Sequence, residues 1–206
     1  MLEQEWRSPQ GLRRFLGRCD RESGRMTSDG QLRGKKAKFL DNAFEANSMS
    51  TEVSIERAEL RHIAEIAPLF DAYRRFYGQV DDPRARSFLE ERVARKESVV
   101  FVARLQGAAI GFCQLYPCFA SVSLTRMFVL YDLFVAPQGR RCGAAGALLR
   151  AAVDYAAGEG AGQLMLQTGI TNLAAQRLYE REGWVRDEEF YVYEYHLRAS
   201  TPASRV

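Results

Sequence analysis

Two arginines lie in a short segment of small residues near the middle of the chain. Residues 139–146 read Gly-Arg-Arg-Cys-Gly-Ala-Ala-Gly, and apolar residues at helical spacing follow to about residue 158. Small side chains let a ligand approach the backbone N–H groups at a helix start, where no carbonyl accepts from them. That end of a helix is electropositive, and two guanidinium groups add full charges. The segment therefore favours a phosphate or pyrophosphate, and the alternative is a tight turn with solvated arginines. It is not a P-loop, because no Gly-Lys-Ser/Thr follows, and its glycine spacing is not that of the dinucleotide fingerprint.

A second candidate group lies on one face of a later helix. Asn172, Ala175, Gln176 and Tyr179 are spaced i, i+3, i+4 and i+7, which places them on one side. Asn172 suits the N-cap, and Gly183 suits a left-handed helix end. We expect a helix between these two residues that presents an amide, a small residue and a phenol along one side.

Asp132 is the one charged residue in the apolar run 127–135, which is typical of a buried central strand. A buried acid needs a partner or a task, so Asp132 is a candidate functional residue. A structural ion pair with an arginine is the alternative. Glu194 is a second candidate acid. Four aromatic residues could wall a ligand pocket, although core packing explains each equally well: Tyr73, Phe76, Tyr77 and Tyr116.

The elements that must position these groups follow from periodicity and turn residues. We expect, in order, a strand near 53–57, helices over 60–78 and from residue 83, strands over 99–103 and 109–116, a strand over 127–135, a helix over 143–158, a strand at 164–166, a helix over 172–182 and a strand over 190–197, with an additional short strand at Trp184. The pair 99–103 and 109–116 should be antiparallel, and the strand, helix and strand from residue 127 should form a parallel crossover. The fold class is mixed α/β.

The charge divides the 206-residue chain into two parts. The chain has 29 basic and 26 acidic residues, for a net charge of +3, and residues 1–48 hold ten of the basic and seven of the acidic ones. Residues 1–48 also lack Val, Ile and Tyr, so we expect a basic, disordered extension before a folded domain over 49–206. An upstream extension of the reading frame, with Met26 or Met49 as the true start, is the alternative.

Several partner classes are not expected. A nucleic-acid-binding role for the basic residues between 33 and 38 is an alternative, but no aromatic residues interleave there for base stacking. Four cysteines without a CxxC pair and two histidines give no metal-ligand spacing, so we expect no metal and reduced thiols. No apolar run is long enough for a membrane span and no secretory signal is visible, so we expect a cytoplasmic protein without a membrane partner.

Two motifs together resemble those of the GNAT superfamily of acetyl-CoA-dependent N-acetyltransferases. The family pattern [Q/R]-x-x-G-x-[G/A] after a buried strand is matched by residues 140–145, and the pattern N-x-x-A-x-x-L-Y-x-x-x-G-[FW] is matched by residues 172–184. The resemblance covers about residues 52–197. It implies a GNAT fold, with a central mixed antiparallel and parallel sheet of six or seven strands flanked by about four helices.

The resemblance also implies roles for individual residues. Backbone groups of the 139–146 loop would hold the pyrophosphate of CoA, the strand around 133–135 would bind the pantetheine arm, and Tyr179 would protonate the leaving thiolate. The cofactor-binding residues implied are Leu133, Phe134, Val135, Arg140, Arg141, Cys142, Gly143, Ala144, Ala145, Gly146, Asn172, Ala175 and Tyr179. The catalytic residues would be Tyr179 and Asp132, and Asp132 would bind the cationic amine or relay its proton. The acceptor-binding residues would be Tyr77, Tyr116, Asp132 and Glu194.

The function implied is transfer of acetyl from acetyl-CoA, as cosubstrate, directly to a primary amine of a small molecule or peptide. A catalytically inactive CoA-binding regulatory module and a protein N-terminal or lysine acetyltransferase are the alternatives. Homodimers are frequent in the family, so a homodimer is a further expectation.

Overall fold

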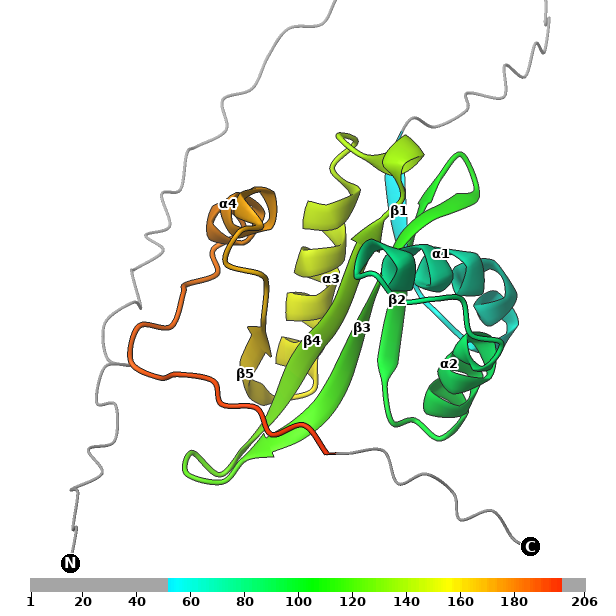
Figure 1. Cartoon of the computed structure of the whole chain (residues 1–206). Coiled ribbons are helices and arrows are strands. Elements are labelled where there is room, and N and C mark those ends of the chain that lie inside the picture. The colour runs from blue at the N-terminus through cyan, green and yellow to red at the C-terminus, as the bar shows by residue number, and fades with distance from the viewer. Residues whose placement is uncertain (1–51, 198–206) are drawn as a thin grey trace, which may run out of the picture. The chain divides into compact units, whose positions relative to one another are not determined.

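The computed structural model describes residues 52–197, which form a five-stranded mixed sheet with helices on both faces (Figure 1). In chain order the elements are β1 Val53–Arg57, the 3-10 turn Leu60–His62, α1 Ile63–Phe76, α2 Arg84–Ala94, β2 Val99–Leu105, β3 Ala108–Ala120, β4 Thr125–Val135, the 3-10 turn Pro137–Gly139, α3 Ala144–Gly158, β5 Ala161–Leu166 and α4 Leu173–Arg181. The predictions for residues 1–48 lie outside the described residues.

The strands follow one another across the sheet in the order β1-β2-β3-β4-β5. The first four are antiparallel neighbours, which confirms the predicted antiparallel pair formed by β2 and β3. β4 and β5 are parallel, and α3 connects them, which confirms the predicted crossover. Among the described residues, no helix is both long and apolar enough to cross a membrane.

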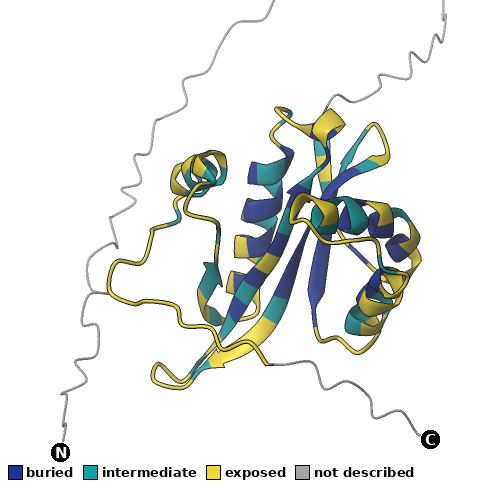
Figure 2. Cartoon of the chain, viewed as in Figure 1, coloured by how far each residue is buried: buried dark blue, intermediate teal, exposed yellow. Residues whose placement is uncertain are grey.

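Two hydrophobic cores lie on the two faces of the sheet. On one face, Leu148 and Leu149 of α3 pack against Phe128 and Leu130 of β4. On the other face, residues of α1 and α2 pack against the sheet; the buried members include Ile63, Ile66, Phe70, Leu89 and Phe112. The chain thus buries its sheet between α3 and the α1–α2 pair, as Figure 2 shows in dark blue.

The predicted number of strands is wrong, because the described residues form five strands instead of six or seven. Neither Phe190–Leu197 nor Trp184 is part of a strand. The alternation of Tyr191, Tyr193 and Tyr195 favours a strand locally, but a strand in a sheet also requires a hydrogen-bonded neighbour. No ladder joins this segment to β5, which is the edge strand of the described sheet, and its residues are exposed (yellow in Figure 2).

A β-bulge in β4 controls which face its residues occupy. Gln114 of β3 pairs with Asp132, and the next residue, Leu115, pairs with Leu130, so Tyr131 is the extra residue. Leu130 lies in the core on the α3 face, whereas Phe134 lies in the core on the α1–α2 face. Because side chains alternate between faces, the extra residue moves Asp132 to the face that Phe134 occupies.

Candidate functional site

A cleft of about 250 Å³ lies between the end of β4 and α4. Eight residues predicted from the sequence to bind the cofactor line it: Leu133, Phe134, Val135, Arg140, Ala145, Asn172, Ala175 and Tyr179. Six further residues complete the lining: Tyr73, Phe76, Tyr77, Thr168, Ala174 and Leu178. The structure therefore brings together the strand, loop and helix parts of the predicted site.

The cleft exists because β4 and β5 separate before β4 ends. Their parallel ladder ends at the pair Leu130 and Leu166, while β4 continues to Val135. Beyond Leu130, β4 pairs with β3 on one side and with no described strand on the other. Backbone groups along that edge lack ladder partners, and a ligand with amide groups can hydrogen-bond them as an added strand would.

The loop before α3 has the geometry of an anion-binding turn. Arg141 and Gly143 have left-handed backbone conformations, with φ of 65° and 85°, and no side chain caps the helix. Left-handed residues in such a turn aim nearby N–H groups toward one concave side. Arg140 turns its Nε toward the Val135 carbonyl oxygen, 3.3 Å away, and lines the cleft. The other predicted loop residues flank the cleft without lining it: Arg141, Cys142, Gly143, Ala144 and Gly146.

The predicted start and end of α4 are confirmed. The Asn172 side-chain oxygen accepts a hydrogen bond from the Ala175 N–H at 3.2 Å, and Gly183 has a φ of 86°. Because its oxygen is used in this cap, Asn172 has its side-chain N–H₂ group left for a ligand. An ion pair of 2.7 Å between Glu182 and Arg150 ties the end of α4 to α3.

Tyr179 lies on the cleft side of α4 and stacks at a tilt on Trp184, with ring centroids 6.3 Å apart. Burial raises the pKa of its hydroxyl, and a hydrogen bond with Thr168 works in the opposite direction. The phenol is therefore protonated at neutral pH, as a proton donor must be.

A second cavity, of about 810 Å³, opens on the α1–α2 face of β4. It shares Tyr73, Tyr77 and Thr168 with the cleft, so the two spaces meet at these side chains. Three predicted acceptor-binding residues line it: Tyr77, Tyr116 and Asp132. The fourth, Glu194, is exposed, lies 3.8 Å from His196 and does not line this cavity.

Asp132 is the buried acid of this second cavity, with 5% of its surface exposed. Burial raises its pKa to about 6, and a hydrogen bond from Tyr73 counteracts part of that rise. Within residues 52–197 no basic side chain comes within 4.0 Å of its carboxylate, so the ion pair considered from the sequence does not form there. Its neighbour across the ladder is the buried Gln114, whose Oε1 has no hydrogen-bond partner in the part of the chain that the structure describes.

Thr168 and Arg74 are among the lining residues of these cavities that the sequence does not single out. Thr168 lies in the loop between β5 and α4 and lines both cavities. From the sequence, Arg74 is only one residue of the predicted helix that becomes α1, yet it lines the second cavity. No local pattern distinguishes either residue, because both gain their place from the packing of distant elements. Among the described residues, no group of three His, Cys, Asp or Glu side chains could hold a metal ion.

Residues 66–184 match the model of a family described as the acetyltransferase (GNAT) family. The uncharacterized N-acetyltransferase YhfO of Bacillus subtilis (strain 168) is 47% identical over 142 residues, which cover 68% of this chain and 95% of that protein. A probable acetyltransferase of Haemophilus influenzae is 38% identical over 101 residues, which cover 48% of this chain and 69% of that protein.

Solved structures agree with these matches. The crystal structure of a probable acetyltransferase has a TM-score of 0.68 at 40% identity and covers 71% of this chain and 99% of its own. The aminoglycoside N-acetyltransferase AAC(6')-Iy in complex with CoA has a TM-score of 0.61 at 20% identity, with coverage of 73% and 99%, and this second likeness shows the fold alone.

Proposed function

The chain belongs to the GNAT acetyltransferase family and is an acetyl-CoA-dependent N-acetyltransferase, and from this premise we propose that it acetylates a primary amine of a small molecule or peptide by direct transfer. Asp132 carries this proposal, because a buried acid without an ion-pair partner in the described residues lies in a cavity that joins the cofactor cleft.

We place the cosubstrate along the cleft between β4 and α4. The pyrophosphate would lie at the start of α3, against the N–H groups of residues 141–146 and the guanidinium groups of Arg140 and Arg141. The pantetheine arm would pair with the edge of Leu133–Val135 that has no described strand partner. This placement puts the thioester near Tyr179 and near the opening to the second cavity.

The acceptor amine enters from the second cavity, where Asp132 attracts its ammonium form. An amine of pKa near 10 must lose a proton before it attacks. With its pKa raised to about 6, Asp132 is ionised at neutral pH and is a stronger base than an exposed aspartate. It therefore accepts the proton, directly or through one water molecule.

The transfer then proceeds in one active site without an acyl-enzyme. The amine nitrogen forms a bond to the thioester carbonyl carbon, and backbone N–H groups near Leu133–Val135 stabilise the negative charge that develops on the carbonyl oxygen. The bond from that carbon to sulfur breaks, and the Tyr179 hydroxyl gives its proton to the departing CoA thiolate. Alignment of amine and thioester supplies a large share of the rate.

The test is release of free thiol from acetyl-CoA in the presence of a panel of primary amines, with acetylated products identified by mass spectrometry. We expect thiol release that depends on one class of amine, with the acetyl group on its nitrogen. The panel includes peptides with free N-termini and with lysine, which tests a protein acetyltransferase role. Tight CoA binding by calorimetry without transfer to any amine would favour the inactive regulatory module and overturn the proposal.

A further inference from the structure

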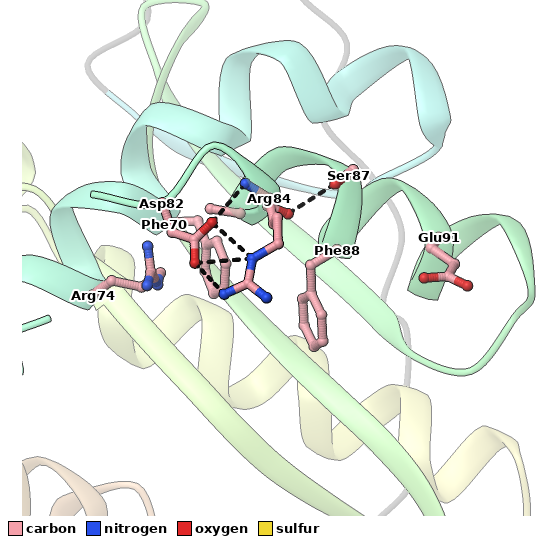
Figure 3. A pocket seen from close by; sticks show the side chains of 8 residues that line it. Phe70, Arg74, Asp82, Arg84, Ser87, Phe88 and Glu91 are labelled. Atoms are coloured by element: carbon pink, nitrogen blue, oxygen red, sulfur yellow. Dashed lines mark hydrogen bonds and ion pairs between the residues drawn. The ribbon is translucent and has the colours of Figure 1, made fainter. Parts of the chain in front are cut away.

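A third cavity, of about 540 Å³, is lined by residues of α1, of α2 and of the loop between them (Figure 3). Phe70, Arg74 and Phe88 line both this cavity and the second cavity, which is the acceptor cavity of the proposed reaction, so the two spaces adjoin along these side chains. The third cavity is rich in charged groups that the transfer reaction proposed above does not use. Whether each of these groups has an ion-pair partner determines which charge a bound acceptor would face on this side of its cavity.

Three of the four charged groups that line the third cavity have ion-pair partners. Asp82 makes hydrogen bonds of 2.6–3.1 Å with the Arg84 side chain, and Figure 3 draws all its interactions toward Arg84. Glu91 pairs with Arg92 at 2.9 Å and with Arg95 at 2.8 Å. These charges are neutralised within the protein, so they give a ligand little net attraction.

Arg74 is the exception among the charged groups of this cavity. Its Nη1 atom is buried and has no hydrogen-bond partner among residues 52–197, and the residue as a whole is half-buried. Arg74 lies near enough to lower the pKa of Asp82, although it contributes less to that shift than Arg84 does, and no ion pair of 4.0 Å or less joins the two residues. Nor is Asp71, three residues earlier on α1, in such a pair with Arg74. A buried guanidinium donor without an acceptor is unfavourable, so this group favours an anion supplied by a ligand.

Asp132 and Arg74 are thus two opposite charges without ion-pair partners in the described residues, and both line the acceptor cavity. Arg74 lies on α1 and Asp132 on β4, and the two elements are in contact next to these residues. Tyr73, the neighbour of Arg74, reaches across to β4, where its hydroxyl lies 3.4 Å from the Tyr131 carbonyl oxygen beside Asp132. Both side chains line the same cavity of about 810 Å³, so one small molecule bound there can face both charges.

We propose that the acceptor is an amino acid or a related amine that carries a carboxylate, with its amine at Asp132 and its carboxylate at Arg74. This inference rests on the proposed function, since it names the acceptor of that reaction. Guanidinium and carboxylate groups match in charge and in planar geometry. Polyamines and other polycations are disfavoured, because their second ammonium group would meet Arg74.

The test compares amines that differ only in the anionic group. Thiol release from acetyl-CoA is measured with free amino acids, with the same amino acids as primary amides, and with their decarboxylated amines, such as lysine against cadaverine. O-phosphoethanolamine provides a different anion. In Arg74→Met, which keeps the length of the side chain, KM for the preferred amino acid should rise roughly 10- to 100-fold, while KM for acetyl-CoA should not change. Arg74→Lys should restore part of the affinity.

Arg86→Met is the matched control, because Arg86 is an exposed arginine of α2 that pairs with Glu90 and lines neither cavity. Equal kcat/KM for acids and amides, or a preference for acids that survives Arg74→Met, would overturn the inference. A stronger preference for O-phosphoethanolamine would overturn the carboxylate assignment. Efficient transfer to amines without an anionic group would sink this inference and leave the proposed function standing.

Calorimetry with the CoA-bound protein gives a second readout that does not need turnover. There the free amino acid should bind more tightly than its amide, and equal affinities would again count against the role of Arg74. Failure of the proposed function looks different, because no amine of any kind would then release thiol.

Discussion

Replacement of Asp132 by asparagine should stabilise the protein at neutral pH while reducing its activity. Burial raises the pKa of Asp132 from 3.8 to about 6, so the folded state holds this proton more tightly than the unfolded state does. The ionised carboxylate therefore costs stability as pH rises from about 4 to about 6, and the cost persists at higher pH. A difference of about two pKa units corresponds to about 3 kcal/mol. That figure is the upper limit of the gain, because asparagine keeps the shape of the side chain but relaxes differently.

The assay is urea unfolding of the wild type and of Asp132→Asn at pH 7 and at pH 4. At pH 7 the variant should be more stable, by up to about 3 kcal/mol, and at pH 4, where the wild-type carboxyl is protonated in the folded state, the gain should largely disappear. Asp154→Asn is the matched control, because Asp154 is an exposed acid on α3, and this variant should show no comparable gain.

The same variant tests the proposed chemistry. In the wild type, kcat/KM should rise as pH increases through about 6, when Asp132 becomes ionised. In Asp132→Asn this limb should be absent, and kcat/KM at neutral pH should fall by about 10²- to 10⁴-fold. A variant that is no more stable at pH 7 than the wild type would refute the stability reasoning. An unchanged limb near pH 6 would refute the role of Asp132 in transfer.

Three further substitutions test the cofactor side of the site. Tyr179→Phe should lower kcat by about 10²-fold or more and leave CoA affinity nearly unchanged, because the ring still packs on Trp184 and only the proton donor is lost; unaltered turnover with chemistry limiting the rate would exclude that role. Arg140→Ala combined with Arg141→Ala should weaken CoA binding by about 10-fold or more in calorimetry, and unchanged affinity would contradict the pyrophosphate assignment. Gly143→Ala should cost about 1–2 kcal/mol in unfolding experiments, since the left-handed φ of 85° is strained for alanine, whereas Gly158→Ala at the other end of α3 has no such φ and should cost little.

The sequence predicts well the features that depend on near neighbours in the chain. The cap at Asn172, the left-handed end at Gly183 and the crossover through α3 all follow from local residue types, and the structure confirms them. The strand predicted at Phe190–Leu197 is wrong, because its alternation of side chains says nothing about whether a hydrogen-bonded neighbour is present.

The second cavity is harder to predict from the sequence. Asp132, Tyr77 and Tyr116 were identified by residue type, and all three line it. Arg74 could not be found in this way, because an arginine on an amphipathic helix is ordinarily solvated, and its unpaired state becomes visible only when α2 is packed beside it.

The bulge at Tyr131 determines on which face of the sheet Asp132 lies. In a regular strand, Asp132 would follow Leu130 by two residues and would share its face, among the aliphatic side chains of α3. One additional residue sends it to the opposite face, into the cavity. In a relative, an acid that aligns with Asp132 therefore has the same position in space only if the relative also has the extra residue of the bulge. If a one-residue gap stands there, the aligned acid lies on the other face of the sheet.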